Sequence, residues 1–280
     1  MMYKFLVATD IDNTLLVTGK DVSPANKRAI EAIRDAGGAF ALATGRSFFL
    51  IGCYAEDLGL DVPCITSNGG ALSDPRIPKE ILSFPIDPAT VRDIMIFLME
   101  KQVLFAGYSS RGVFFGPDYG RKDAGDNKAF FRDYNSKVPE GKKVRLEDMS
   151  RERILNGDLP EFNKILTIAA DEETRKILRN RDDISCCAST PLFLDLMAPG
   201  TSKGKALLRL AELLEIPKDK TFALGDNEND ISMIKAARYG IAVGNATDKT
   251  KEAADHVACD CADDGFSRAV FEFILPSLNL

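Results

Sequence analysis

The chain has few of the residues on which most metal and nucleophile sites depend. It contains one histidine, His256, and six cysteines that form no Cys-x-x-Cys pair. A single imidazole excludes histidine-rich zinc sites, and the cysteine spacing does not fit a zinc or disulfide framework. We expect His256 to be a surface residue beside a strand. His256 could still act as a lone general base, but catalysis by carboxylates is the favoured expectation.

Long apolar runs, low-complexity segments and an excess of positive charge are also missing. No run of about 18 apolar residues occurs, so no membrane-spanning helix is expected. The chain has Lys+Arg 36 and Asp+Glu 42, and this balance argues against a nucleic-acid binder, whose surface is normally basic. The first ten residues indicate a buried strand rather than a signal peptide, so a cytoplasmic location is expected. No obligate protein partner is evident.

The chain has 280 residues, of which 45% are hydrophobic, which is enough for roughly two domains. Strand and helix patterns alternate in residues 1–84 and return in residues 200–280. This alternation predicts one doubly wound, mainly parallel, Rossmann-like α/β core. Residues 85–199 follow another pattern, with strand and helix candidates mixed among turns, and are expected to form an inserted α+β domain.

The core elements are expected from buried apolar runs and from helix start and stop signals. Ser23-Pro24 begins a helix and Gly37-Gly38 ends it, and a further helix is expected at 47–58. The strands of the core are expected at 5–8, 39–43, 63–67, 221–224 and 241–243.

Polar residues follow four of these strands. In open α/β sheets, ligands bind outside the carboxyl ends of the strands. Carboxylates gathered there repel one another unless a cation joins them, and Mg²⁺ prefers oxygen ligands and substrate phosphate. Lys203, at the start of a helix, supplies a point charge for a phosphoryl oxygen. The four segments are Asp10-Ile11-Asp12-Asn13-Thr14, Thr44-Gly45-Arg46, Ser67-Asn68-Gly69-Gly70 and Gly225-Asp226-Asn227-Glu228-Asn229-Asp230.

Each piece has a plainer interpretation when it is taken alone. Asp12 or Thr44 could cap a helix, Lys203 could be a solvated helix residue, and the Asn68 segment could be a turn. Their occurrence together at strand ends, in this order, favours a functional site over these separate interpretations.

In this order, the segments resemble the motif set of the haloacid dehalogenase superfamily, which reads Asp-x-Asp-x-Thr, a strand-end Thr or Ser, a Lys, and Gly-Asp-x-x-x-Asp. The insert between the second and third motifs resembles the cap of the Cof-type branch, which also carries a segment like Ser67-Asn68-Gly69-Gly70. The resemblance covers essentially the whole chain. Asn13 departs from the pattern because that branch most often has Gly there, but Asn tolerates unusual backbone angles.

The resemblance implies a Mg²⁺-dependent phosphatase that hydrolyses a small phosphorylated metabolite, such as a sugar phosphate, through an aspartyl-phosphate. Pyridoxal or flavin phosphates are less favoured substrates. The implied roles are a nucleophile (Asp10), a general acid and base (Asp12), metal binding (Asp10, Asp12 through its backbone carbonyl, Asp226 and Asp230), phosphate binding (Thr44, Gly45, Lys203 and Asn229) and substrate contact (Arg46 and Asn68).

Other functions remain open at this point. A sugar-phosphate mutase or phosphotransferase of the same superfamily shares the first chemical step. A phospho-receiver module and a non-catalytic phospholigand-binding protein are more remote, because a receiver has no use for the insert and both Asp10 and Asp12 are intact. Specificity is expected to come from the insert, with Tyr108, Arg111, Tyr119 and Arg121 as candidates.

Overall fold

The computed structural model describes residues 3–77, 79–120 and 128–278. Contacts within the chain divide it into two compact units, Met1–Ile77 with Ser202–Leu280, and Pro78–Thr201. The sequence predicts boundaries at 84/85 and 199/200, which lie seven and two residues, respectively, from these. Within the described ranges, none of the helices combines the length and the apolar character that crossing a membrane demands.

The first unit is built on a parallel sheet with the strand order β14-β13-β12-β1-β2. Strand β1 pairs with β12 on one side and with β2 on the other. Thr9 of β1 lies opposite Leu224 of β12, so the polar segments that follow these two strands begin side by side. The strands are β1 (Phe5–Thr9), β2 (Gly38–Leu42), β12 (Thr221–Gly225), β13 (Tyr239–Ala242) and β14 (His256–Val257).

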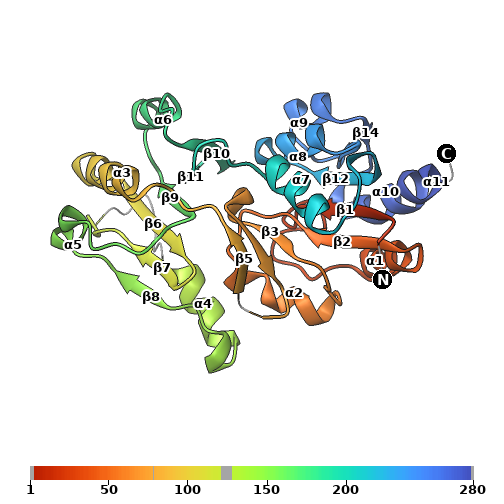
Figure 1. Ribbon diagram of the computed structural model, residues 1–280, viewed down its shortest axis with the longest axis horizontal. Helices are drawn as coiled ribbons and strands as arrows, with labels where there is room; N and C mark the ends of the chain where they lie inside the picture. Colours follow the sequence, from red (N-terminus) through yellow and green to blue (C-terminus); the bar gives the residue numbers. More distant parts are fainter. Residues whose placement is uncertain (1–2, 78, 121–127, 279–280) are drawn as a thin grey trace. The chain divides into compact units, whose positions relative to one another are not determined.

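Helices cover both faces of this sheet. Helices α1 and α10 lie on one face, whereas α7, α8 and α9 lie on the other (Figure 1). This arrangement confirms the predicted doubly wound α/β core. The helices of the unit are α1 (Pro24–Asp35), α2 (Gly52–Asp57), α7 (Lys203–Leu213), α8 (Ile231–Ala236), α9 (Asp248–Ala253), α10 (Gly265–Ala269) and α11 (Leu275–Ser277).

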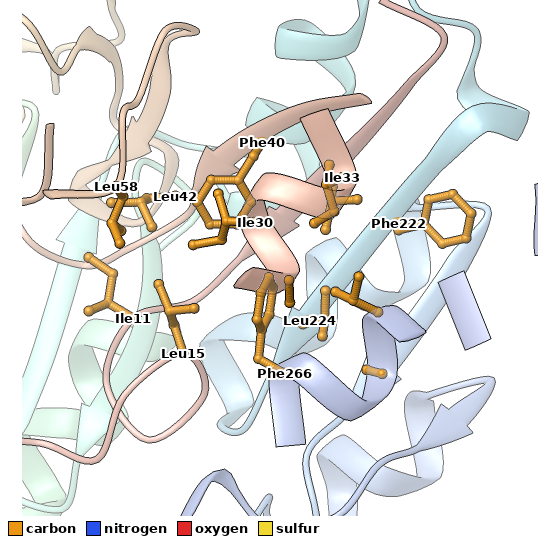
Figure 2. Packing of buried hydrophobic residues seen from close by; sticks show 14 of the residues in the cluster. Ile11, Leu15, Ile30, Ile33, Phe40, Leu42, Leu58, Phe222, Leu224 and Phe266 are labelled. Carbon is orange, nitrogen blue, oxygen red and sulfur yellow. The ribbon is translucent and has the colours of Figure 1, made fainter. Parts of the chain in front are cut away.

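Helix α1 shows how the local sequence directs this packing. The Ser23 side chain accepts a backbone N–H of the first turn, which caps the helix at the predicted place. Ile30 and Ile33 lie on the buried face beside Phe40 of β2 (Figure 2). The Phe40 ring meets the ring of Phe266 edge to face at 5.8 Å, which joins α10 to the same core.

The single helix expected at 47–58 was wrong. The segment forms a short 3₁₀ turn, Phe48–Leu50, followed by α2. Gly52 lies where the expected helix would have its interior, and glycine costs about 1 kcal/mol there relative to alanine. The chain therefore breaks at this point and buries Phe48 and Leu50 against the unit.

Next to β2, the chain makes a hairpin that carries one of the polar segments. Strands β3 (Cys64–Thr66) and β4 (Ala71–Asp74) pair antiparallel around the turn Ser67–Gly69. An isolated parallel bridge between Ala43 and Ile65 sets β3 beside the end of β2. The turn therefore lies next to the Thr44 segment.

The second unit is an α+β module, as the sequence predicts. Its sheet has the strand order β10-β11-β9-β6-β7-β8, with β7 and β8 parallel and the other pairs antiparallel. The elements are β5 (Lys79–Ser83), α3 (Pro88–Glu100), β6 (Leu104–Ser109), β7 (Gly112–Phe115), α4 (Ala129–Lys137), β8 (Leu146–Asp148), α5 (Arg151–Asn156), β9 (Lys164–Ile168), α6 (Glu172–Arg179), β10 (Ser185–Thr190) and β11 (Phe193–Met197).

Close contact between α7 and α8 depends on a glycine. A Cβ built on Gly204 would lie 2.1 Å from the backbone oxygen of Ser232. We expect Gly204→Ala to lower the free energy of unfolding by about 1–3 kcal/mol, because the two helices must move apart. Thermal and urea unfolding would measure this loss. Gly52→Ala, whose Cβ meets open space, is the matched control and should leave stability unchanged or slightly higher. Equal stability of both variants would contradict the prediction.

Candidate functional site

The centre of the site is Asp10, directly after β1. Its backbone N–H donates to the Leu224 carbonyl at 3.0 Å, which extends the β1–β12 pairing. The Lys203 ammonium donates to Asp10 Oδ1 at 2.8 Å and to Asp230 Oδ1 at 2.6 Å. Lys203 is only 1% exposed, so both ion pairs are shielded from water. Three sequence segments that lie far apart in the chain thus meet at one ammonium group.

Close backbone packing brings Lys203 to this position. Ser202 caps α7 by accepting a backbone N–H from the first turn, so Lys203 begins the helix. Gly69 has a φ of +95°, and a Cβ on it would lie 2.3 Å from the Ser202 carbonyl oxygen. The β3–β4 hairpin therefore lies directly against the start of α7, and a larger residue at Gly69 would displace it.

The segment after β12 folds around the carboxylate of Asp230. Asp230 Oδ2 accepts the backbone N–H groups of Asp226 and Asn227 at 3.0 and 3.1 Å. Gly225 makes this fold possible, because a Cβ there would lie 2.3 Å from that of Asp230. Thr14, which is fully buried, donates to Asp226 Oδ1 at 2.9 Å and ties the first segment to this one.

Asp10, Asp226 and Asp230 form a cluster in which one carboxylate oxygen of each lies within 4.8 Å of the others. Burial raises the pKa of Asp10 to about 8; Lys203 opposes this rise, and the nearby Asp230 and Asp226 add to it. Burial and the Asp230 charge likewise raise the pKa of Asp226 to about 6. Three carboxyl groups thus share one ammonium group, and a divalent cation bound beside them would relieve the repulsion between their ionised forms.

The donor set of the cluster fits a hard cation. All of its side-chain donors are carboxylate oxygens, which Mg²⁺ prefers. Asp230 already uses Oδ1 for Lys203 and Oδ2 for two backbone N–H groups. Asp10 and Asp226 are therefore better placed to bind a cation, with Asp230 orienting the loop and the lysine.

Asp12 is held by an arginine from the Thr44 segment. Arg46 donates from Nε to Asp12 Oδ2 at 2.9 Å and from a terminal nitrogen to Oδ1 at 2.7 Å, a two-point ion pair. Arg46 also donates to the Tyr54 hydroxyl at 3.2 Å. The sequence predicts that Arg46 contacts substrate; in the structure it contacts Asp12, and the substrate contact stays a prediction.

Asn13 occupies a turn that explains its departure from the family pattern. Its φ is +59°, in the left-handed region that glycine and asparagine tolerate best. Its N–H donates to the Leu16 carbonyl at 2.7 Å, and its carbonyl accepts from the Asn245 side chain at 2.8 Å. Asparagine can therefore replace glycine without altering the turn.

The remaining phosphate-site and substrate-site candidates form a second group. The Thr44 hydroxyl accepts the Arg46 backbone N–H at 3.1 Å, and the Thr44 carbonyl accepts the Asn68 N–H at 3.0 Å. Asn68 Oδ1 accepts from Asn229 Nδ2 at 3.1 Å. Gly45 lies against the Asn68 carboxamide. The core candidates thus lie in three contacting groups: one around Lys203, the pair of Asp12 with Arg46, and one around Asn68.

Two contacts escaped the sequence analysis. Thr14 was part of the recognised motif but received no role, although it bonds Asp226. The contact of Tyr54 with Arg46 could not be predicted, because nothing in the sequence connects the two residues.

His256, predicted as a surface residue, is partly buried in β14 and stacks on Phe273 with 4.7 Å between the ring centroids.

The specificity candidates of the second unit have different surroundings. Tyr108 is buried, with the Lys164 ammonium 4.3 Å from its ring centroid, so it packs inside this unit. Arg111 is exposed and Tyr119 is partly buried. Arg121 lies outside the described residues.

Comparison with known proteins agrees with this fold. The sequence pattern of the haloacid dehalogenase-like hydrolase family matches residues 7–270. The protein is similar to Phosphatase YwpJ of Bacillus subtilis, at 29% identity over 90% of this chain and 93% of the relative. Pyridoxal phosphate phosphatase YbhA of Escherichia coli is 25% identical over 96% of this chain and 98% of the relative.

A solved structure of a phosphatase is also similar to this chain in fold. The HAD subclass IIB sugar phosphatase BT4131 superposes with a TM-score of 0.81 at 25% identity, covering 96% of this chain and 99% of that one. The parallel core with its acidic strand ends defines a haloacid dehalogenase fold. The chain belongs to the haloacid dehalogenase-like hydrolase family, and the predicted resemblance to its Cof-type branch is confirmed.

The raised pKa values predict how stability depends on pH. Burial raises the pKa of Asp10 in the folded, metal-free protein to about 8, from an ordinary value of 3.8. The native state therefore binds more protons in this interval, so the free energy of unfolding of the metal-free protein should fall as pH rises from about 4 to about 8. Asp226 should add to the fall up to about pH 6.

Urea midpoints measured in EDTA across this pH range would test the prediction. Asp10→Asn, which removes the titrating group, should flatten the slope. A wild-type midpoint that rises steadily from pH 4 to pH 8 would contradict it.

Proposed function

We propose that this protein hydrolyses phosphate monoesters of small metabolites through an aspartyl-phosphate formed on Asp10. The observation that carries the proposal is the buried contact of Lys203 with Asp10, beside the carboxylates of Asp226 and Asp230. A carboxylate nucleophile beside an ammonium group and a cation site suits phosphoryl transfer, in which catalysis rests on positioning and charge stabilisation.

In the first step, a carboxylate oxygen of Asp10 attacks phosphorus while the bond from phosphorus to the ester oxygen breaks. Asp12 gives a proton to the leaving alkoxide, so the alcohol departs neutral. Both Asp12 oxygens accept from Arg46 in this structure, so the ion pair must open before Asp12 can donate a proton. Lys203 and Thr44 hold the phosphoryl oxygens, with Gly45 and Asn229 beside them.

In the second step, water attacks the phosphorus of the aspartyl-phosphate. Asp12 takes a proton from this water, the bond between phosphorus and Asp10 breaks, and free phosphate leaves. Asp10 returns as a carboxylate and Asp12 is again protonated, so the cycle closes without another reactant.

Mg²⁺ is the cation that we propose for the site, held by the carboxylates of Asp10 and Asp226 and by the Asp12 backbone carbonyl. Bound there, it would neutralise charge on the phosphoryl group. Asp230 supports the site by orienting Lys203 and the loop.

The second unit is proposed as the cap that selects the leaving group, because the residues of the core site address only the phosphate and its cation. Among substrate classes, sugar phosphates come first, and pyridoxal phosphate and flavin phosphates follow. The relatives whose names state a substrate include both a sugar phosphatase and a pyridoxal phosphate phosphatase. The cytoplasmic location expected from the sequence stays a prediction.

The nucleophile and the acid can be separated by substitution. Asp10→Asn should lower kcat by about 10³-fold or more, because no aspartyl-phosphate can form. Asp12→Asn should also be slow, and should leave phosphoenzyme that is detectable by mass spectrometry after acid quenching. Glu228→Gln, an exposed carboxylate of the same loop as Asp226, is the matched control and should retain the rate. Unchanged rates in both aspartate variants would refute the assignment.

Phosphate release from a panel of phosphorylated metabolites, with and without Mg²⁺, tests the activity itself. We expect Mg²⁺-dependent release that is concentrated on one chemical class and lost in EDTA. Asp226→Asn should raise the Mg²⁺ concentration needed for half-maximal rate by about 10- to 100-fold. No release from any compound while Mg²⁺ binds would refute the phosphatase proposal, and a requirement for a bisphosphate activator would indicate a mutase.

A further inference from the structure

The turn between β3 and β4 has an unusual backbone. Ser67, Asn68 and Gly69 have φ values of +52°, +55° and +95° in succession. A single non-glycine residue in the left-handed region is uncommon, and serine is a poor candidate for it. Conformations of this kind persist where the surroundings enforce them, and they gather at functional sites.

Contacts from two sides enforce this turn. The Ser67 N–H donates to the Arg46 carbonyl at 2.9 Å, and the Asn68 N–H donates to the Thr44 carbonyl at 3.0 Å. On the other side, Gly69 lies against the Ser202 carbonyl at the start of α7. The turn is therefore held between the Thr44 segment and the helix that carries Lys203.

This backbone directs the Asn68 carboxamide toward Asn229. Asn68 is 1% exposed, and its Oδ1 accepts from Asn229 Nδ2 at 3.1 Å. A Cβ on Gly45 would lie 3.1 Å from Asn68 Oδ1, so glycine at that position leaves the carboxamide the room it needs. Two segments of the site thus adapt to this one side chain.

The Asn229 side chain contains a buried polar atom that destabilises the fold. Its Oδ1 is buried and has no hydrogen-bond partner among the described residues. A buried amide oxygen without a partner is unfavourable, so its presence in a natural protein calls for an explanation, and a role in the adjacent site is one. The hydrogen bond to Asn68 fixes the Asn229 carboxamide in this orientation, although its oxygen remains without a partner.

We propose that Asn68 is a positioning residue, which holds the carboxamide of Asn229 in the orientation that the phosphate site requires. It acts through Asn229 and not by contact with the leaving group. This inference rests on the phosphatase activity proposed above, and it replaces the substrate-contact role that the sequence suggested for Asn68.

Asn68→Gly is the sharpest test, because glycine adopts the same backbone without strain and lacks the carboxamide. With p-nitrophenyl phosphate and Mg²⁺, we expect kcat to fall by about 10- to 100-fold, as misplacement of a site group causes. The thermal midpoint should stay near that of the wild type. A wild-type kcat in this variant would overturn the inference.

Glu215→Gly is the matched control. Glu215 is exposed just after α7 and has a φ of +56°, so this change relieves the same kind of backbone strain outside the site. Its kcat should equal that of the wild type. If its kcat fell as far as that of Asn68→Gly, the loss would reflect altered backbone at such positions and the inference would fail.

A double variant separates positioning from direct contact. If Asn68 acts through Asn229, then Asn68→Gly combined with Asn229→Ala should be no slower than Asn229→Ala alone, within about twofold. Rate losses that multiply would show that Asn68 acts independently of Asn229, and would overturn the proposal.

Gly45→Ala gives a second route that keeps the carboxamide. The added Cβ should push Asn68 aside by a few tenths of an ångström and lower kcat. In the Asn68→Gly background the same change should lower kcat by a smaller factor, because the carboxamide that the Cβ displaces is gone. A factor equal to that in the wild-type background would show that Gly45→Ala does not act through Asn68, against the inference.

Inorganic phosphate binding, measured by calorimetry with Mg²⁺ present, gives a readout without turnover. Asn68→Gly should weaken this binding by about the same factor as Asn229→Ala, and unchanged affinity would overturn the inference. An inactive wild-type enzyme would refute the proposed function, whereas an active wild type with an equally active Asn68→Gly variant would refute this inference alone.

Discussion

The Lys203 ammonium lies buried between Asp10 and Asp230, and the arrangement of the site depends on this interaction. Removing one partner of a buried ion pair typically costs about 3–5 kcal/mol, because the charge left behind has no compensation. Lys203 begins α7, whereas the two carboxylates follow β1 and β12. The three groups therefore fix the position of a helix relative to two strand ends. The same contact sets the Asp10 carboxyl group beside a positive charge.

The negative charge that Lys203 leaves uncompensated explains the chemistry available at this edge. Burial favours the neutral form of Asp10 and Asp226, and Asp230 adds repulsion to both. A cation bound there would reverse these effects, so metal binding and ionisation of Asp10 would favour each other. Asp230 already accepts from Lys203 and from two backbone N–H groups, which leaves fewer of its lone pairs for a ligand than Asp226 and Asp10 have.

Glycines allow the polar segments to approach this closely. Gly225 lets the loop fold onto Asp230, Gly69 lets the hairpin reach the start of α7, and Gly45 makes room for Asn68. Because each of these glycines lacks a Cβ, a neighbouring group can approach the backbone closely and is thereby positioned. The strained turn at Ser67 and Asn68 belongs to the same system, because contacts on two sides hold it in place. Packing and function are therefore linked at these positions.

The sequence alone determined the alternation of buried strands and helices, the inserted module, and the candidate residues Asp10, Asp12, Lys203 and Asp226. Such features are local, since apolar runs, caps and strand-end motifs are written in neighbouring residues. The tertiary structure decided which side chains contact each other. It pairs Arg46 with Asp12 and Asn68 with Asn229, and it sets the oxygens of Asp230 against Lys203 and two backbone N–H groups. These contacts join segments that are far apart in the chain, and their geometry depends on strand order and on close backbone packing. Local sequence patterns carry no information about strand order or backbone packing, because these two features arise only when the sheet assembles.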